Sequence, residues 1–261
     1  MKLSFSKYQG AGNDFIMLDN FNGYYDNLSI SDIKQACDRK FGIGADGLIL
    51  LRHHTTTDFE VIYYNADGSQ SFCGNGARCA VAFARAIDRL PAPHTTFTAI
   101  DGLHEAWLCQ DEVKLKMSDV VTIKLLGNAF ELHTGSPHYV MIDENHSAAH
   151  VDMVGKSIRY NDIYKAHGIN VNLMRYTDTG IQVATYERGV EAETLSCGTG
   201  VTAAALVYAR LQQIQQGQVA IQTKGGNLAV QWQALPNGAF TEIYLIGPAQ
   251  FVFNGTYELK R

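Results

Sequence analysis

Short runs in which apolar and polar residues alternate cover most of the chain. Alternation over about four to eight residues is typical of a β-strand with one buried face. Turn-forming pieces, such as LPNG at 235–238, separate several of these runs. The predicted strands are residues 3–8, 15–19, 47–52, 59–65, 104–109 and 112–117 in the first half, and residues 129–135, 138–143, 170–176, 180–187, 217–223, 227–233 and 241–247 in the second.

Helical patterns are fewer. Alanine-rich apolar runs that start near Gly76 and Gly200 predict two buried helices of about 12 residues each. Two further helices are predicted at residues 29–39 and 149–159. The first of them starts with Ser29 and Asp32, which have the spacing of a capping box. Hairpins predominate over alternating β–α units, so we expect an α/β protein of the α+β type, with mostly antiparallel sheets wrapped around the buried helices.

The chain contains one motif twice. CGNGARCAVAFARA at 73–86 is echoed by CGTGVTAAALVYAR at 197–210, and the two copies are 197 − 73 = 124 residues apart, close to half of the 261 residues. This spacing predicts an internal duplication that produced two pseudo-symmetric domains, each with one central helix. We place the domains at residues 1–117 and 118–248. Residues 249–261 are expected to return to the first domain as a closing strand.

Composition and charge exclude several classes of partner. The formal net charge is −5 and no Lys/Arg-rich run is present, so we expect neither nucleic acid nor a membrane surface as a partner. The first residues lack the apolar core of a signal peptide, and no apolar stretch approaches the ~20 residues that span a bilayer. We therefore expect a cytoplasmic protein. Five scattered cysteines argue against a disulfide framework and for reduced thiols.

Two of these cysteines occupy positions suited to acid–base chemistry. Cys73 and Cys197 each precede a predicted helix N-terminus, where unpaired N–H groups favour a thiolate and bind anions. The glycines that follow let the backbone approach a substrate carboxylate closely. If both sites held one carboxylate, the α carbon would lie between two sulfurs, and a thiolate base and a thiol acid on opposite faces would invert it. Without a cofactor, aimed dipoles in a water-excluded pocket have to stabilise the carbanion.

The other three cysteines lack this glycine frame. We expect Cys37, Cys79 and Cys109 to be small buried hydrophobic residues. A metal site is not expected, because Cys73 and Cys79 are not joined by a second CxxC or a cluster of histidines.

Several separated motifs resemble the diaminopimelate epimerase family, in order and from end to end. They are GAGNDF at 10–15, FGIGADGL at 41–48, NADGS at 65–69, CGNGARC at 73–79, GSPH at 135–138, NVN at 170–172, YERG at 186–189 and SCGTG at 196–200. The resemblance implies two pseudo-symmetric domains with the active site in the cleft between them. It also implies an isomerase that interconverts LL- and meso-2,6-diaminopimelate in lysine and peptidoglycan precursor biosynthesis. Neither pyridoxal phosphate nor a metal is needed, and a homodimer is the family expectation.

The same resemblance assigns roles to individual residues. Cys73 and Cys197 match the catalytic pair, and His138 and Glu187 match residues that orient the cysteines and the substrate. The residues that match the binding site for the reacting end of the substrate are Gly74, Asn75, Gly198 and Thr199. Those that match the binding site for its distal end are Asn13, Asn65, Asn170 and Arg188, next to Glu187. The chain departs from the common pattern at Ser136, where many members carry Asn, and at Gly47, where some carry Gln.

Alternatives exist for several of these residues. Arg188 has the planar guanidinium that grips a carboxylate through two bonds, but it could instead form a surface or interdomain ion pair. His138 could be a structural histidine. Asn13 and Asn65 lie in turn-like words, where Asn is common for backbone reasons.

The two cysteines also fit other functions. A two-cysteine racemase for proline or hydroxyproline would share the C-G-x-G words, but it would have no use for a residue such as Arg188 that binds a distal carboxylate. A non-enzymatic redox switch would join Cys73 and Cys197 in a disulfide that changes domain packing.

Overall fold

The computed structural model describes residues 1–90 and 92–260. Within these residues the chain forms four helices and seventeen strands, which confirms the α+β class. It divides into two compact units. Unit 1 contains Met1–Leu115 and the segment that begins at Gly247, and unit 2 is Lys116–Ile246.

The sheet of unit 1 is mostly antiparallel. Along the sheet the strands follow the order β17, β1, β2, β3, β4, β5, β6, β7, and only the β2–β3 and β4–β5 pairs are parallel. The elements are β1 (Lys2–Gly10), β2 (Asn13–Asp19), α1 (Ile30–Cys37), β3 (Gly47–Arg52), β4 (Phe59–Asn65), α2 (Gly74–Ala86), β5 (His94–Ala99), β6 (Gly102–Cys109), β7 (Glu112–Lys116) and β17 (Gln250–Glu258).

Unit 2 repeats this topology. Its strands follow the order β8, β9, β10, β11, β12, β14, β15, β16, and the parallel pairs are again the third and the fifth, β10–β11 and β12–β14. The elements are β8 (Ile123–Leu126), β9 (Ala129–His133), β10 (Pro137–Ile142), α3 (Ala148–Arg159), β11 (Asn170–Thr177), β12 (Gly180–Glu187), β13 (Ala192–Thr194), α4 (Gly198–Leu211), β14 (Gln216–Thr223), β15 (Gly226–Ala234) and β16 (Phe240–Pro248). Two units with one order of pairings confirm the predicted pseudo-symmetry.

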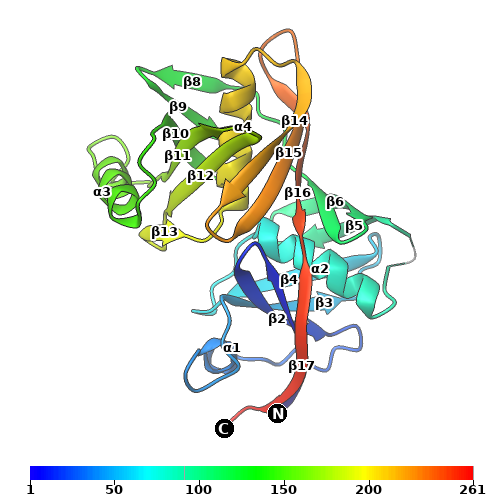
Figure 1. Cartoon of the computed structure of the whole chain (residues 1–261). Coiled ribbons are helices and arrows are strands. Elements are labelled where there is room, and N and C mark those ends of the chain that lie inside the picture. The colour runs from blue at the N-terminus through cyan, green and yellow to red at the C-terminus, as the bar shows by residue number, and fades with distance from the viewer. Residues whose placement is uncertain (91, 261) are drawn as a thin grey trace. The chain divides into compact units, whose positions relative to one another are not determined.

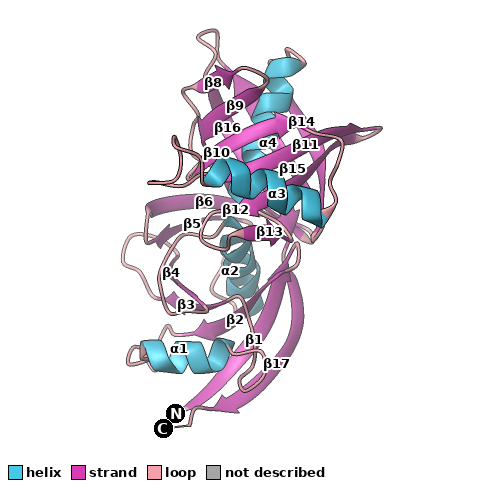
Figure 2. Ribbon diagram, turned by 90° about the vertical axis from the view of Figure 1, so that its left-hand side faces the viewer, coloured by secondary structure: helices cyan, strands magenta, loops and turns pink. Residues whose placement is uncertain are grey.

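Each unit is built around one buried helix. Helix α2 contacts β1, β2, β3, β4, β6 and β17, and helix α4 contacts β9, β10, β11, β12, β14 and β15. In Figures 1 and 2 both helices lie among the strands of their own unit. Small residues make this possible, because the buried alanines at 77, 80 and 84 of α2 and at 203–205 of α4 let strands approach on several sides.

The central helices begin two residues earlier than the sequence predicts. Helix α2 starts at Gly74 and α4 at Gly198, so that Cys73 and Cys197 are themselves the N-cap residues. Glycine has a poor helix propensity, but tertiary packing of the apolar helix outweighs that preference. Helix α1 starts after the predicted cap, where Ser29 and Asp32 form both bonds of a capping box.

The alternation of apolar and polar residues does not predict three of the strands. Strands β5, β8 and β13 were not predicted, because they are short or, in β5, contain a run of polar threonines. The expectation that Cys109 is buried is wrong. Cys109 ends β6 and pairs with Glu112 across a two-residue turn, so it lies at the exposed end of a hairpin. Cys37 and Cys79 are buried, and all five cysteines are free thiols.

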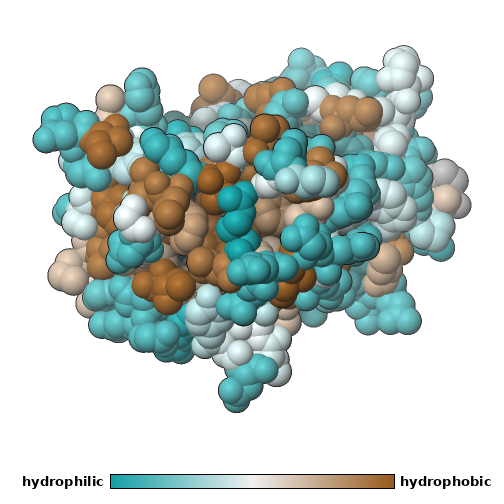
Figure 3. Space-filling model, turned by 90° about the horizontal axis from the view of Figure 1, so that it is seen from above, coloured by the Kyte–Doolittle hydropathy of each residue, from teal (hydrophilic) through white to brown (hydrophobic). Residues whose placement is uncertain are grey.

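The surface shows a mixed character. On the face seen in Figure 3, hydrophobic side chains form several brown groups between hydrophilic ones. Apolar residues that are exposed in small groups are normal on folded proteins. Within residues 1–90 and 92–260, no helix has the length and apolar composition needed to cross a bilayer.

The core role of α4 is tested by two leucines of the same helix. Leu206 is fully buried, whereas Leu211 is 37% exposed at the helix end. Leu206→Ala should lower the free energy of unfolding by about 2–5 kcal/mol, because it leaves a cavity in the core of unit 2. Leu211→Ala should cost less than about 1 kcal/mol. Urea unfolding followed by circular dichroism measures both, and equal effects would contradict the central position of α4.

Candidate active site

Cys73 is held at the start of helix α2 by its own cap geometry. Its backbone is extended, with φ −133° and ψ 113°, and its Sγ accepts a hydrogen bond from the Gly76 N–H at 3.4 Å. The side chain is partly buried. An N–H donor that points at the sulfur favours the thiolate form.

Asn13 supplies a second contact to Cys73 and its amide has one orientation. Its Nδ2 donates to Asp46, and a carboxylate only accepts, so Oδ1 must point the other way. There it accepts from the Cys73 thiol at 3.5 Å. Cys73 therefore has a donor on one side and an acceptor on another, which suits a group that must exist as thiol and as thiolate.

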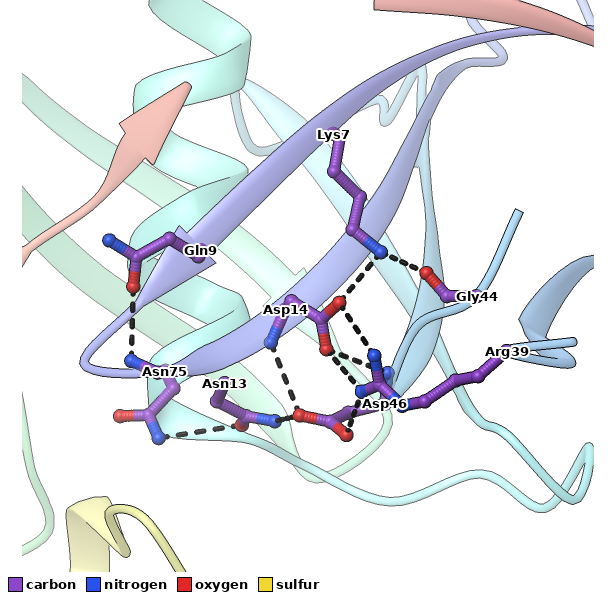
Figure 4. A network of polar contacts seen from close by, with 9 residues as sticks. Lys7, Gln9, Asn13, Asp14, Arg39, Gly44, Asp46 and Asn75 are labelled. Carbon is purple, nitrogen blue, oxygen red and sulfur yellow. Dashed lines mark hydrogen bonds and ion pairs between the residues drawn. The ribbon is translucent and has the colours of Figure 1, made fainter. Parts of the chain in front are cut away.

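A charged network holds Asp46 behind Asn13 (Figure 4). Arg39 donates to Asp14 at 2.6 Å and to Asp46 at 2.7 Å, and Lys7 pairs with Asp14 at 2.7 Å. Burial raises the pKa of Asp14, but the bonds from Arg39 and Lys7 outweigh it and lower the pKa to about 2. Asp14 therefore stays ionised at neutral pH, and the bonds of Arg39 to both carboxylates hold Asp46 against the Asn13 amide.

Asn75 belongs to the same group of residues and lies in the first turn of α2. We call Cys73, Asn13 and Asn75 the half-site of unit 1. Its Nδ2 donates to Asn13 Oδ1 at 3.4 Å, and its Oδ1 accepts from Arg78 Nη2 at 3.0 Å. Asn75 is 2% exposed and Arg78 is fully buried. Since a guanidinium only donates, Arg78 fixes the orientation of Asn75 in the same way as Asp46 fixes that of Asn13.

Cys197 occupies the equivalent position at the start of α4, with different neighbours. Its Sγ lies 3.5 Å from Thr199 Oγ1, and that hydroxyl lies 2.9 Å from His138 Nε2. His138 comes from β10 and is fully buried. The half-site of unit 2 is therefore a chain of contacts from His138 through the Thr199 hydroxyl to the Cys197 sulfur, which we call the relay.

The tautomer of His138 follows from Asn172. Asn172 Nδ2 donates to the Tyr139 carbonyl at 3.1 Å, while its Oδ1 accepts from Thr185 Oγ1 at 2.9 Å. The same Nδ2 lies 3.0 Å from His138 Nδ1, which must accept. His138 Nε2 therefore carries the hydrogen and donates it to Thr199 Oγ1. The hydroxyl hydrogen of Thr199 is then available to Cys197 or to a ligand.

His138 is neutral. Burial lowers its pKa to about 3, and the charges of His133 and Arg188 act in the same direction. A neutral, oriented imidazole can position a neighbour but holds no positive charge near Cys197.

Gly200 leaves room for the amide behind this relay. A Cβ at Gly200 would lie 2.4 Å from Asn172 Oδ1 and 3.0 Å from Thr185 Oγ1. Any larger residue would displace the pair that sets the His138 tautomer. The second glycine of C-G-T-G therefore has a packing reason in this unit.

Asn170 and Arg188 lie together at another point of unit 2. Asn170 Oδ1 accepts from the Arg188 backbone N–H at 2.8 Å, and its Nδ2 donates to Ser136 Oγ at 2.9 Å. The exposed Arg188 side chain donates to the His167 carbonyl at 3.0 Å. Among residues 1–90 and 92–260 its side chain forms no ion pair, so the alternative of an ion-pair role for Arg188 has no support there.

The remaining candidates are placed individually. Asn65 uses its side chain within its own turn, where Nδ2 donates to Ser69 Oγ at 3.0 Å and Ser71 Oγ at 3.2 Å. Asn65 thus stabilises its own turn, which is a common task of Asn at such positions. Glu187 is the partly buried last residue of β12. Gly74 and Gly198 are the first residues of α2 and α4.

The predicted residues thus fall into local groups. Unit 1 brings together Asn13, Cys73, Gly74 and Asn75, whereas unit 2 brings together His138, Cys197, Gly198 and Thr199. Sequence reasoning missed the residues that orient these groups, namely Asp46, Arg78, Asn172 and Thr185. Asp46, Arg78 and Asn172 lie inside recognised motifs, but only contacts could show their task. Within the described part of the chain, no cluster of His, Cys, Asp and Glu has the geometry to hold a metal ion.

Comparison with known proteins identifies the family. A family model described as diaminopimelate epimerase matches residues 5–121 and 130–252. The chain belongs to the diaminopimelate epimerase family. A diaminopimelate epimerase of Flavobacterium psychrophilum is 46% identical over 253 residues, which are 96% of this chain and 98% of that relative. Another, of Chlorobaculum tepidum, is 42% identical over 260 residues, which are 96% of this chain and 99% of that relative.

Solved structures of more distant proteins share the fold of this member of the diaminopimelate epimerase family. A phenazine biosynthesis protein of the PhzF family from Bacillus anthracis has a TM-score of 0.76 and 11% identity, covering 99% of both chains. A hydroxyproline epimerase from Agrobacterium vitis has a TM-score of 0.69 and 12% identity, covering 98% of this chain and 92% of that one. At such low identities the likeness supports the fold alone.

The state of His138 can be measured directly. ¹⁵N NMR of the folded protein should show His138 as the neutral Nε2–H tautomer down to about pH 3. Below pH 6.5, its ordinary pKa, His138 binds a proton in the unfolded chain but stays neutral in the folded chain. The contribution of His138 to stability should therefore fall as the pH drops from 6.5 to about 3. An imidazolium that forms near pH 6, or an Nδ1–H tautomer, would contradict the relay.

Proposed function

We propose that the protein is a cofactor-independent epimerase that interconverts LL- and meso-2,6-diaminopimelate. The observation that carries the proposal is the pair of cysteines that cap topologically equivalent helices in a chain of this family. Relatives that match nearly the whole chain are named diaminopimelate epimerase, which supports the substrate. The reaction belongs to lysine and peptidoglycan precursor biosynthesis.

In this proposal one cysteine of each unit acts on a single α carbon. The thiolate of one takes the α proton, so that the Cα–H bond breaks and an S–H bond forms. The thiol of the other then gives its proton to the opposite face, where a new Cα–H bond forms. Cys73 and Cys197 exchange these roles when the direction of the reaction reverses.

The carbanion needs stabilisation that the helix ends are suited to give. Helices α2 and α4 begin at Gly74 and Gly198, and the first backbone N–H groups of a helix have no carbonyl partner within the helix itself, which makes those of Gly74, Asn75, Gly198 and Thr199 the candidates. Such groups bind a carboxylate and strengthen their bonds as negative charge develops on it. In this proposal they hold the carboxylate at the reacting end.

His138 has an orienting role in this scheme rather than that of a base. Its low pKa keeps it neutral, and its Nε2–H holds the Thr199 hydroxyl near Cys197. We assign the distal end of the substrate to Arg188, because its guanidinium suits a carboxylate. The other residues assigned to that end of the substrate are Glu187, Asn170, Asn65 and Asn13.

The cytoplasmic location and the homodimer stay predictions, as does the placement of the active site between the two domains.

Replacement of either cysteine should stop inversion. Cys73→Ser and Cys197→Ser should each lower the rate of epimerisation by about 1,000-fold or more, because a serine hydroxyl is a far weaker acid than a thiol and does not ionise to an anionic base at neutral pH. The assay is exchange of the α hydrogen of diaminopimelate with deuterium from D₂O, with reductant and without added cofactor. Cys109→Ser, at an exposed cysteine outside both half-sites, is the matched control and should keep full activity. Exchange on proline but not on diaminopimelate would refute the substrate assignment.

Arg188 should govern substrate affinity more than chemistry. Arg188→Lys should raise KM for diaminopimelate by about tenfold, because an ammonium replaces two parallel bonds with one point charge, and Arg188→Met should raise it further. Steady-state kinetics separate KM from kcat. Arg175→Lys is the control, because Arg175 binds Gln182 in the same unit. An unchanged KM for Arg188→Met would remove Arg188 from the site.

A further inference from the structure

Four aromatic rings of unit 1 form a stack that ends at the residue before Cys73. Phe59, Phe97 and His104 are direct cross-strand partners on β4, β5 and β6, so their side chains share one face of the sheet. The ring centroids of Phe59 and Phe97 are 5.4 Å apart, and those of Phe97 and His104 are 5.3 Å apart. Phe72 adds the fourth ring, 4.2 Å from His104 and within 2° of parallel. We call these four residues the ring stack.

The imidazole of His104 is held in place within the ring stack. Its Nε2 lies 2.8 Å from Asp101 Oδ1, a contact at the edge of the ring. The fully buried ring of Phe97 packs against it, and the His104 side chain is 14% exposed. An edge contact together with a buried neighbour restricts rotation of the imidazole. His104 therefore offers Phe72 a fixed surface that is connected to the core of unit 1.

The backbone of Cys73 is fixed by helix α2 on one side only. Its carbonyl accepts from the Ala77 N–H at 2.8 Å, but its φ of −133° and ψ of 113° are not helical. The direction of its side chain therefore also depends on where the preceding chain is held. The contacts of Sγ are long, 3.5 Å to Asn13 and 3.4 Å to the Gly76 N–H, so a small displacement would break them.

The segment before Cys73 has polar contacts at the surface and an apolar contact at Phe72. Asn65 donates to the hydroxyls of Ser69 and Ser71, and both serines are exposed. Water competes for such bonds, so their net contribution is modest. Phe72 is partly buried, and water favours the contact of its ring with His104. The stacked ring is therefore the anchor that water does not replace.

We infer that His104 is a positioning residue, which holds Cys73 in its half-site through the stack with Phe72. Parallel stacking uses the faces of both rings, so the flat ring of His104 carries this role. The effect on catalysis rests on the proposed function. The hold on the segment before Cys73 can be measured without substrate.

Amide hydrogen exchange of the substrate-free protein tests this hold. His104→Ala should speed exchange of the backbone amides of residues 71–73 by about three- to tenfold, because the segment opens more often without the ring contact. His104→Phe keeps a flat ring and should return the rates to within about twofold of the wild type. Mass spectrometry of peptides that cover residues 66–76 measures the rates. Unchanged exchange in His104→Ala would overturn the inference.

His94 supplies the matched control within the same hairpin. Its Nε2 lies 2.7 Å from Glu105, and its ring centroid lies 4.8 Å from that of Trp107. His94→Ala thus removes the same two kinds of contact at the first residue of β5. It should leave exchange at residues 71–73 unchanged. Equal acceleration by His94→Ala and His104→Ala would mean a general loosening of the hairpin and would also overturn the inference.

Steady-state kinetics with diaminopimelate should place the effect on the chemical step. His104→Ala should lower kcat by about tenfold and leave KM within about twofold, because a displaced sulfur slows proton transfer while the groups assigned to the substrate carboxylates stay in place. His104→Phe should recover most of kcat. A higher KM with unchanged kcat would contradict a role through Cys73.

Substitution of Phe72 tests the route. Phe72→Ala should reproduce the loss of kcat, and the double variant with His104→Ala should be no slower than either single variant, because both remove the same contact. Losses that multiply would show that His104 acts by another route. If His104→Ala does not fold, Phe72→Ala still decides the question, since wild-type exchange and kcat in that variant would refute the inference.

Failures of the two proposals can be told apart. Faster exchange of residues 71–73 in His104→Ala, with no reaction of the wild type on diaminopimelate, would remove the proposed function and leave the hold of the ring stack intact. Normal reaction of the wild type, with unchanged exchange and kcat in His104→Ala, would do the opposite.

Discussion

The burial of a helix on several sides by the strands of its own unit is the constraint on which both half-sites depend. Because α2 and α4 are surrounded by strands, their first turns lie inside the protein, where the leading N–H groups of each helix act in a low dielectric. The small residues of the repeated motif permit this packing, and they also bring the cap residues Cys73 and Cys197 close to neighbouring strands. Packing and chemistry therefore arise from the same fourteen-residue motif.

Groups behind the cysteines then orient the amides and the imidazole that lie near the sulfurs. An amide or imidazole can be turned either way at little cost, so its direction has to be imposed from outside. Asp46 does this for Asn13 and Arg78 does it for Asn75. In unit 2 the same task falls to Asn172, whose own direction comes from a backbone carbonyl and a threonine hydroxyl. One unit thus uses charged supports for its sulfur and the other uses neutral ones.

Much of this architecture could be predicted from the sequence, because period, repetition and capping are local signals. The two central helices, the Ser29 cap and most strands follow from such patterns. The orienting residues could not be found in that way. The motif NVN contains Asn170 and Asn172, which look alike in the sequence. In the structure Asn170 accepts from the Arg188 backbone N–H, whereas Asn172 sets the tautomer of His138. That difference arises from pairing of β11 with neighbours distant in sequence. Cys109 shows the same limit, since its exposure depends on a hairpin turn.

Duplication by itself produces two cysteines with the same surroundings and therefore the same pKa. Equal pKa values are a difficulty for a reaction that uses one thiolate and one thiol. At each moment one sulfur must hold a proton and the other must not, so a symmetric site would be divided between two resting forms. A substrate isomer that needs a particular form would then bind only the fraction of the protein that presents it. The two copies share their N-cap geometry but differ at the buried position five residues after each cysteine, which is Arg78 in one copy and Thr202 in the other. The repeat keeps the positions of the two sulfurs, and the residues that contact each sulfur, Asn13 in one unit and Thr199 in the other, distinguish their surroundings.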